Sequence, residues 1–342
     1  MIARSEYLIH AREFPAGVPT EYLNMKRSDV NLLSIKASTG TYSIGRFEDI
    51  VNMLRKDDLL VYNNSKIVRS SLKGYLRKAD RYVRVNFGYS ETGMIAEIRD
   101  RLHEYQSGDT ITFVDGSFLT LAKKYEKYGR FWHADFSDPA SYKKLINSCG
   151  DFIIYGKNSP LYPASVYESD LATVEGSVEY PSASRPFTGE IIASLKKRGI
   201  QFAPLTIHCN LGSLDASEFL HQESLLPEYY NIPETTSEMI SNAMENGGRI
   251  IALGTSVARA LTTVRRNDIF KPGSGFTSIF IDQDTETGLD GIVTGMHDPT
   301  TSHMLLVSAF AGIGLIRAAY EASGEHGFRW HEFGDECIIL RS

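Results

Sequence analysis

The stretch "IIALGTSVARAL" (250–261) decides the fold: an apolar run ends in a turn of small residues and leads into a helical pattern. The stretch "VTGMHDPTTSHMLLVSAFAG" (293–312) repeats this arrangement. A strand that ends where a helix begins leaves backbone N–H groups at the positive end of the helix dipole, which suits a carboxylate, a phosphate or the edge of a ribose. Short Gly-Thr-Ser turns also occur as plain helix caps, so the turn alone leaves both interpretations open.

Helices and strands alternate on both sides of the first stretch. The segment "TGEIIASLKKRGI" (188–200) has helical spacing and precedes the strand-like "QFAPLTIHC" (201–209). A further helix is expected in 233–248, capped by Thr235 or Thr236 and ended by two glycines. Repeated helix-then-strand units predict an α/β layer fold.

Residues 67–160 have a different pattern. Five segments there alternate apolar and polar residues between Gly, Asp and Ser turns: 82–90, 94–100, 109–116, 118–125 and 130–137. This alternation predicts a small antiparallel β-barrel. We therefore expect an α/β main domain made of residues 1–66 and 161–342, with a β-rich, barrel-like domain inserted at 67–160.

Bulk composition excludes several classes of protein. The 342 residues are 42% hydrophobic and 23% charged, as in ordinary folded proteins, and the net charge of −6 argues against a surface that attracts nucleic acid as a whole. Short basic doublets leave room for a local basic strip. Charged residues interrupt the N-terminal segment, and no run approaches 18 apolar residues, so we expect a cytoplasmic protein without a membrane span.

Common catalytic and metal-binding motifs are missing from the sequence. It contains no GxxxxGK[ST], GxGxxG, HExxH or GxSxG pattern. The three cysteines are far apart and odd in number, which argues against a disulfide framework and a CxxC metal clip. We expect no metal.

Polar side chains follow three of the expected strands. In open α/β sheets ligands bind at the carboxyl ends of the strands, so these side chains are expected to converge. A lone histidine at the end of a strand is more often a hydrogen-bonded structural residue, but two histidines in matching positions make a functional role about as frequent as a structural one. The six residues are His208, Asn210, Thr255, Arg259, His297 and Asp298.

An ordered set of motifs resembles the S-adenosylmethionine:tRNA ribosyltransferase-isomerase family of queuosine biosynthesis. These motifs span most of the chain outside the inserted segment: "LLVYNNSKI" (59–67), "GSVEYPSASRPFT" (176–188), "TIHCNLGS" (206–213), "PEYYNIPE" (227–234), "GGRIIALGTSVARAL" (247–261), "LDGIVTGMHDP" (289–299), "LLVSAFAG" (305–312) and "FGDECII" (333–339).

The resemblance implies an α/β domain with an inserted β-barrel, in agreement with the division above. It also implies that the ribosyl part of S-adenosylmethionine, a co-substrate, is transferred to a 7-aminomethyl-7-deazaguanine base in tRNA and isomerised to an epoxycyclopentanediol. Adenine and methionine leave, and the chemistry requires no metal. A monomer or a weak homo-oligomer is expected.

The resemblance also implies roles for individual residues. His208, His297 and Glu228 are the candidate catalytic residues, and Glu228 with Arg259 is suited to the sulfonium and the methionine carboxylate. The residues expected to bind the co-substrate are Asn63, Ser182, Thr188, Gly212, Gly254, Thr255, Arg259, Asp290 and Thr294.

The chain departs from the family pattern at several positions around the expected pocket, most of all in one loop. Where the family has Gly-Leu-His, this chain has Ser184, Arg185 and Pro186, which removes a histidine and introduces a cation. The change motivates the hypothesis that this loop faces a different acceptor, either an anion or a molecule of different shape. Three alternatives follow: the tRNA-modifying enzyme, an S-adenosylmethionine-consuming enzyme that acts on a small molecule or on the co-substrate alone, and a non-catalytic member that only binds.

Overall fold

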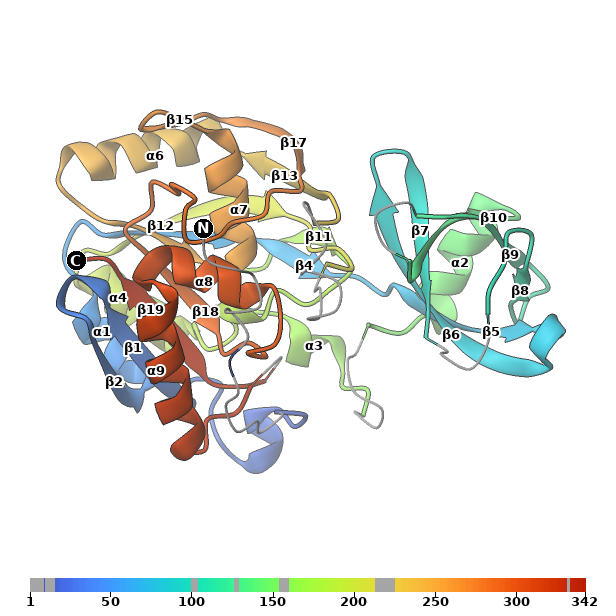
Figure 1. The fold of residues 1–342 in the computed structure, drawn as a ribbon, viewed down its shortest axis with the longest axis horizontal. Coiled ribbons are helices and arrows are strands. Elements are labelled where there is room, and N and C mark those ends of the chain that lie inside the picture. Colours follow the sequence, from blue (N-terminus) through green and yellow to red (C-terminus); the bar gives the residue numbers. More distant parts are fainter. Residues whose placement is uncertain are drawn as a thin grey trace.

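The computed structural model describes residues 9, 16–99, 104–125, 129–153, 160–212, 225–330 and 333–342. The chain forms two lobes, a large α/β lobe and a smaller β-barrel joined to it by extended connections (Figure 1). The α/β fold with a barrel is the fold class that the sequence predicts.

A nine-stranded sheet is the centre of the large lobe, in the order β17-β13-β12-β3-β14-β18-β19-β1-β2. Its four central strands, β12 (Gln201–Ile207), β3 (Leu59–Asn63), β14 (Ile250–Leu253) and β18 (Gly291–Gly295), are mutually parallel. Their carboxyl ends therefore lie at one edge. The other strands are β1 (Asn31–Lys36), β2 (Thr41–Arg46), β13 (Glu228–Ile232), β17 (Gly273–Thr277) and β19 (Glu336–Leu340).

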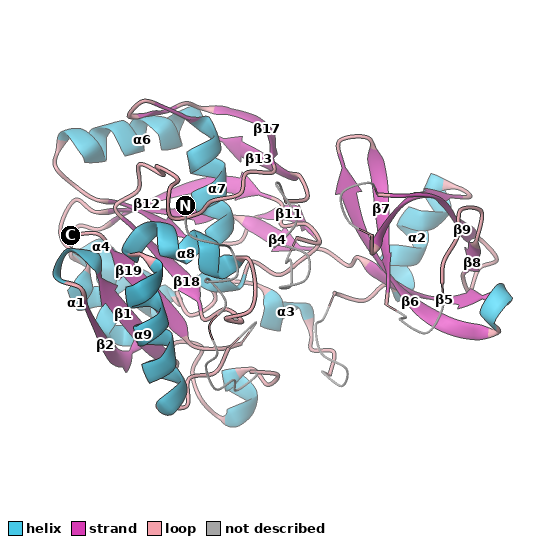
Figure 2. Cartoon of the chain, viewed as in Figure 1, coloured by secondary structure: helices cyan, strands magenta, loops and turns pink. Residues whose placement is uncertain are grey.

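Helices cover both faces of this sheet (Figure 2). On one face lie α6 (Glu234–Glu245), α7 (Thr255–Val264), α8 (His303–Ala311) and α9 (Ile313–Glu325). On the other face lie α1 (Ile50–Met53) and α4 (Gly189–Lys197). Smaller elements are α3 (Ala164–Tyr167) and the strand pairs β4 (Ser65–Ile67) with β11 (Val174–Ser177) and β15 (Arg265–Arg266) with β16 (Ile269–Phe270).

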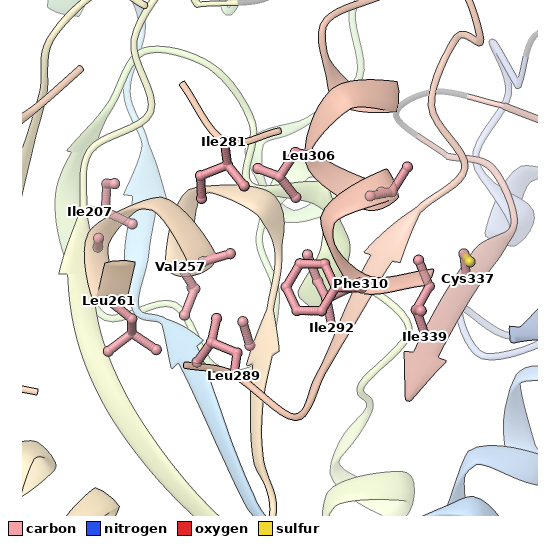
Figure 3. Close-up of a cluster of buried hydrophobic side chains, with 14 of the residues drawn as sticks. Ile207, Val257, Leu261, Ile281, Leu289, Ile292, Leu306, Phe310, Cys337 and Ile339 are labelled. Atoms are coloured by element: carbon pink, nitrogen blue, oxygen red, sulfur yellow. The ribbon is translucent and has the colours of Figure 1, made fainter. Parts of the chain in front are cut away.

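Two hydrophobic clusters hold the layers together. Successive side chains of a strand point to opposite faces, so Leu59 and Val61 join one cluster while Leu60 joins the other. Because both faces are covered, the central strands are almost continuously apolar. Figure 3 shows part of the first cluster, where Val257 and Leu261 of α7 lie near Ile207 and other labelled side chains.

The small lobe is a closed six-stranded barrel in the order β10-β7-β6-β5-β8-β9. Its strands are β5 (Ser71–Leu76), β6 (Arg81–Ser90), β7 (Gly93–Ile98), β8 (Thr110–Thr112), β9 (Phe118–Lys124) and β10 (Phe131–Phe136). Five of these strands, β6 to β10, lie in the segments that the alternating pattern indicates, whereas β5 lies before the first of them. The placement of the domain boundaries at 66 and 160 stays a prediction.

Two local expectations need correction. Helix α2 (Pro139–Cys149) lies in the inserted segment, where strand alternation gave no sign of it; Asp138 caps it, and Leu145 and Ile146 join the barrel core. Helix α6 begins after Pro233, so neither Thr235 nor Thr236 caps it. Thr236 is buried and donates a hydrogen bond to the Pro204 carbonyl oxygen instead. The prediction that glycine ends the helix is correct: Gly247, which follows the C-cap residue Asn246, has a φ of +72°.

No single helix in the described ranges is long and apolar enough to cross a membrane. Helices α8 and α9 pass the test of length and composition only when taken together, and they are bent by 113° at their junction.

Candidate active site

A cavity of about 560 Å³ opens at the carboxyl ends of the four parallel strands. Each strand, or the segment that follows it, contributes to the wall: Asn63 at the end of β3, Gly212 after β12, Gly254 after β14 and Thr294 in β18. Of the six polar residues expected to converge, Thr255, Arg259, His297 and Asp298 line this cavity, whereas His208 and Asn210 do not. The roles of these residues stay a prediction.

The turn after β14 forms one wall. Gly254 has a φ of +104°, a conformation that favours glycine, and it is followed at once by helix α7. Thr255 and Ser256, in the first turn of α7, line the cavity. The positive end of the α7 dipole thus lies against the cavity, as the sequence indicates.

Arg259 and Glu228 form a buried ion pair in the same wall. Arg259 donates from Nη2 and Nε to Glu228 Oε2, and from Nη2 to Ser256 Oγ at 3.2 Å. Burial opposes the charge of Arg259, but the Glu228 carboxylate outweighs it and the pKa is raised. Arg259 lines the cavity, and its Nη1 makes no hydrogen bond with the described residues.

Two stacked histidines line the cavity on the side of β18. The rings of His297 and His303 are nearly parallel, at 8°, with centroids 3.9 Å apart. Thr294 Oγ1 lies 2.8 Å from His297 Nε2, and Thr301 Oγ1 lies 3.3 Å from His303 Nδ1. Hydroxyl contacts and stacking fix the orientation of both imidazoles, as required of a group that transfers a proton.

Aromatic side chains form another part of the wall. Tyr162, Tyr167, Tyr180 and Phe333 all line the cavity and contact one another, with ring centroids 5.6 to 6.4 Å apart. Aromatic faces of this kind suit a flat heterocycle. The sequence gave no warning of this group, because its members come from separate segments.

The barrel also reaches the cavity. Arg99 and Arg130 line it, and both make ion-pair contacts with the buried Glu97 of β7. The end of β6 contacts the segment after β12: Tyr89 donates to the His208 carbonyl oxygen, and Asn210 Nδ2 donates to the Tyr89 carbonyl oxygen at 2.6 Å. The cavity is therefore bounded by both lobes.

His208 does not line this cavity. Its Nδ1 lies 2.7 Å from Ser65 Oγ, its ring stacks on Tyr229, and burial lowers its pKa. A Cβ on Gly176 would come within 2.4 Å of the ring, so the ring fills the space beside that glycine. These contacts indicate a structural histidine rather than a catalytic one.

Four more expected residues lie away from the cavity. Thr188 caps α4, and Asp290 accepts a hydrogen bond from the Ile250 N–H at the opposite end of the strands. Pro186 accepts from the Thr188 N–H. Arg185 is buried, donates to Glu21 and to the Val166 carbonyl oxygen, and stacks over Phe333. Its guanidinium is thus neutralised within the protein, which contradicts the hypothesis of an anion-binding loop.

The remaining expected residues reach the cavity in different ways. Ser182, Ser184 and Gly212 line it. Asn63 also lines it, but its amide oxygen accepts from the Ser65 and Ile207 N–H groups and its Nδ2 donates to the Ile207 carbonyl oxygen at 2.7 Å. Asn63 therefore ties β3 to β12. In the part of the chain that the structure describes, no three His, Cys, Asp or Glu side chains are placed to hold a metal ion.

Sequence reasoning missed His303. The sequence places it six residues after His297, at the start of the next helix, where a strand-to-helix turn brings both side chains to one edge. The six-residue spacing between His297 and His303 across this turn could have predicted that both side chains lie at the same site.

Comparison with known proteins decides the family. The model of the queuosine biosynthesis protein family matches residues 11–339 of this chain. The chain belongs to this queuosine biosynthesis family. Two relatives in it are the S-adenosylmethionine:tRNA ribosyltransferase-isomerases of Natranaerobius thermophilus, 29% identical over 96% of this chain and 98% of that protein, and of Halothermothrix orenii, 28% identical over 96% and 99%.

A solved structure shares the fold of this queuosine biosynthesis family member. The crystal structure of the S-adenosylmethionine tRNA ribosyltransferase from Thermotoga maritima aligns with a TM-score of 0.55 at 23% identity, covering 98% of this chain and 100% of that one. The two proteins therefore share their architecture along nearly the whole length.

Proposed function

We propose that this protein is an S-adenosylmethionine-dependent ribosyltransferase-isomerase of queuosine biosynthesis. It transfers the ribosyl part of S-adenosylmethionine to 7-aminomethyl-7-deazaguanine in tRNA, isomerises it to the epoxycyclopentanediol, and releases adenine and methionine. The observation that carries the proposal is the cavity at the strand ends, which gathers Arg259, Thr255, Thr294 and His297 in a chain whose relatives bear the name of this activity.

The co-substrate needs an anion site and a base. The sulfonium acidifies the ribose C5′ protons, so a base must remove one of them to start the rearrangement. Of the three histidine and glutamate candidates, His208 is turned away and Glu228 is held by Arg259. His297 is then the best candidate for this base, with Thr294 fixing its Nε2.

The methionine carboxylate is expected at the start of α7. The free Nη1 of Arg259 and the backbone N–H groups after Gly254 present positive charge on one wall of the cavity. Glu228 orients the guanidinium and limits the cost of burying it. This arrangement supports a bound carboxylate without any metal.

The tRNA is expected to enter between the two lobes. Arg99 and Arg130 bring cationic side chains from the barrel to the cavity wall, where a phosphate backbone could lie. We propose that residues 67–160 form a separate domain that frames the acceptor side. A cytoplasmic location and a monomer or weak homo-oligomer remain predictions.

The small-molecule alternative has lost its main support. It rested on lost family histidines and on the rebuilt loop, above all on Arg185 as a free cation in the pocket, and that side chain is paired with Glu21. Complementation of a host that lacks the queuosine enzyme tests the proposal: we expect queuosine to reappear in tRNA, and to disappear again with His297→Ala. Release of adenine without any change in the tRNA would contradict the assignment of the acceptor.

A further inference from the structure

Glu336 is a buried acid whose second oxygen has no partner. It begins strand β19, its residue is 3% exposed, and its Oε2 has no hydrogen-bond partner among the residues that the structure describes. The neighbouring Asp335 differs: it accepts hydrogen bonds from the N–H groups of Asn31 and Arg329. An unpartnered buried carboxyl is unfavourable and therefore calls for an explanation.

The Glu336 side chain lies directly behind the cavity wall. Gly295 of β18 is its partner across the sheet, and Glu336 Oε1 is 3.9 Å from the position that a Cβ on Gly295 would take. Ser182 Oγ is 3.8 Å from the same position. Because Gly295 and Ser182 both line the cavity, the missing side chain leaves a gap with two polar oxygens beside it.

The surroundings favour the neutral acid. Burial and the adjacent Asp335 raise the pKa of Glu336 well above its usual range, although the Arg185 guanidinium acts in the opposite direction. A neutral carboxyl offers one donor and one acceptor side by side. That pattern complements the edge of a nitrogen heterocycle in which an N–H group adjoins a ring nitrogen.

The aromatic wall belongs to the same region. Phe333 precedes Glu336 by three residues, lines the cavity, and lies under the Arg185 guanidinium at 5.0 Å. Tyr167 and Tyr180 contact Phe333 and line the cavity too. Phe333, an aromatic side chain of the cavity wall, thus belongs to the same segment of the chain as the acid.

We propose that Glu336 is a ligand-positioning residue that hydrogen-bonds the edge of a flat nitrogen heterocycle through the gap beside Gly295 and Ser182. The inference rests on the proposed function, which supplies two such heterocycles, the adenine of S-adenosylmethionine and the deazaguanine of the acceptor. The acid is retained in a poorly satisfied position because the ligand satisfies it.

The test compares Glu336→Ala with Glu336→Gln by calorimetry. The probes are S-adenosylmethionine, adenosine and 7-aminomethyl-7-deazaguanine. Ala removes both hydrogen bonds, so affinity should fall tenfold or more, whereas Gln keeps a donor and an acceptor and should stay within about threefold of wild type. If Glu336→Ala loses affinity for both S-adenosylmethionine and adenosine, Glu336 binds adenine. If it loses affinity only for 7-aminomethyl-7-deazaguanine, Glu336 binds the acceptor base.

Thermal unfolding of the ligand-free variants separates this role from a structural one. Glu336→Ala should melt at a higher temperature than wild type, because it removes an unsatisfied buried group. The matched control, Asp335→Asn, should melt lower, because that carboxylate is fully bonded. A lower melting temperature for Glu336→Ala would overturn the proposal.

Three further binding results would also contradict it. Unchanged affinity for all probes in Glu336→Ala, with normal wild-type binding, would overturn the role of Glu336 alone. If Glu336→Gln loses affinity for S-adenosylmethionine but not for the other two probes, an ionised Glu336 binds the sulfonium instead. Wild-type protein that binds none of the three probes would overturn both this inference and the proposed function.

Discussion

Two buried arginine–carboxylate pairs lie at opposite ends of strand β14. At the amino end, Arg249 binds Asp58 through Nε and Nη2, while Nη1 donates to the Ser342 carbonyl oxygen and Nη2 also to that of Met53. At the carboxyl end, Arg259 binds Glu228 through Nε and Nη2 and leaves Nη1 at the cavity. All three nitrogens of the Arg249 guanidinium bind within the fold, whereas Arg259 Nη1 makes no hydrogen bond with the described residues. We propose that this nitrogen binds the ligand.

The difference shows what distinguishes a structural ion pair from a functional one. Burial alone does not, since all four side chains are at most 10% exposed. Removing one partner of either pair is expected to lower the free energy of unfolding strongly, because the remaining charge is then buried without an opposite charge. An ion pair can contribute to ligand binding only if one of its donors is not already bonded within the fold. Arg259 has such a donor, and Arg249 does not.

The largest expected effect is the loss of stability when the Arg249–Asp58 pair is broken. Asp58→Ala removes the carboxylate that also accepts the N–H groups of Arg55 and Arg249. Losing one partner of such a pair costs about 3 to 5 kcal/mol of unfolding free energy. Urea unfolding measures it. If the protein stays folded, its affinity for S-adenosylmethionine should match wild type; a loss of stability below about 1 kcal/mol would show that the pair is not structural.

The next effect concerns binding. Arg259→Lys keeps the charge but loses the planar fork, so the contact with the carboxylate weakens by about 1.5 to 3 kcal/mol, more than tenfold in affinity. Arg249→Lys is the matched control and should lower stability without changing affinity. Calorimetry with S-adenosylmethionine distinguishes them, and equal affinities for both variants would remove Arg259 from the site.

Asp290→Asn should have a smaller effect, on stability alone. Asp290 accepts the Ile250 N–H at 2.8 Å, and an amide oxygen can replace the carboxylate there. We expect the free energy of unfolding to fall by about 0.5 to 1.5 kcal/mol at most, as urea unfolding would measure. Affinity for S-adenosylmethionine should not change, because this residue lies at the amino end of the strands. A tenfold weaker Kd would restore the expectation from family resemblance that Asp290 binds the co-substrate.

The smallest effect is a pH dependence at His208. Burial lowers its pKa from 6.5, so below that pH the unfolded chain binds a proton that the folded protein does not. The contribution of His208 to stability is complete above pH 6.5 and is lost as the pH falls through its lower folded pKa. His208→Gln should therefore lose less stability between pH 7.5 and 5.5 in paired urea titrations. Parallel curves for the two proteins would refute this assignment.

The sequence predicts helices, strands and turns well where their formation depends only on residues that are neighbours in the sequence. The Gly254 turn, the glycine end of α6 and the strand alternation of the barrel follow from φ preference and side-chain period. Helix α2 was missed because its first turn, Asp138-Pro139, follows a strand directly, and the alternation of the segment dominated the interpretation.

Side-chain partners were less predictable, because they come from distant segments. Arg185 finds Glu21, which lies 164 residues away in the sequence, and Glu228 finds Arg259. Motif matching placed Thr188 and Asp290 with the co-substrate, although their hydrogen bonds serve a helix cap and a strand end. The aromatic wall joins residues of 162–180 to Phe333, a contact that periodicity does not encode.

The most direct test of the account is product analysis after incubation with S-adenosylmethionine, with and without tRNA that carries 7-aminomethyl-7-deazaguanine. We predict that adenine and methionine appear in equal amounts, only when this tRNA is present, and that the base in tRNA gains the ribosyl-derived group. Adenine and methionine released at the same rate without tRNA, or no release in either case, would contradict the central claim.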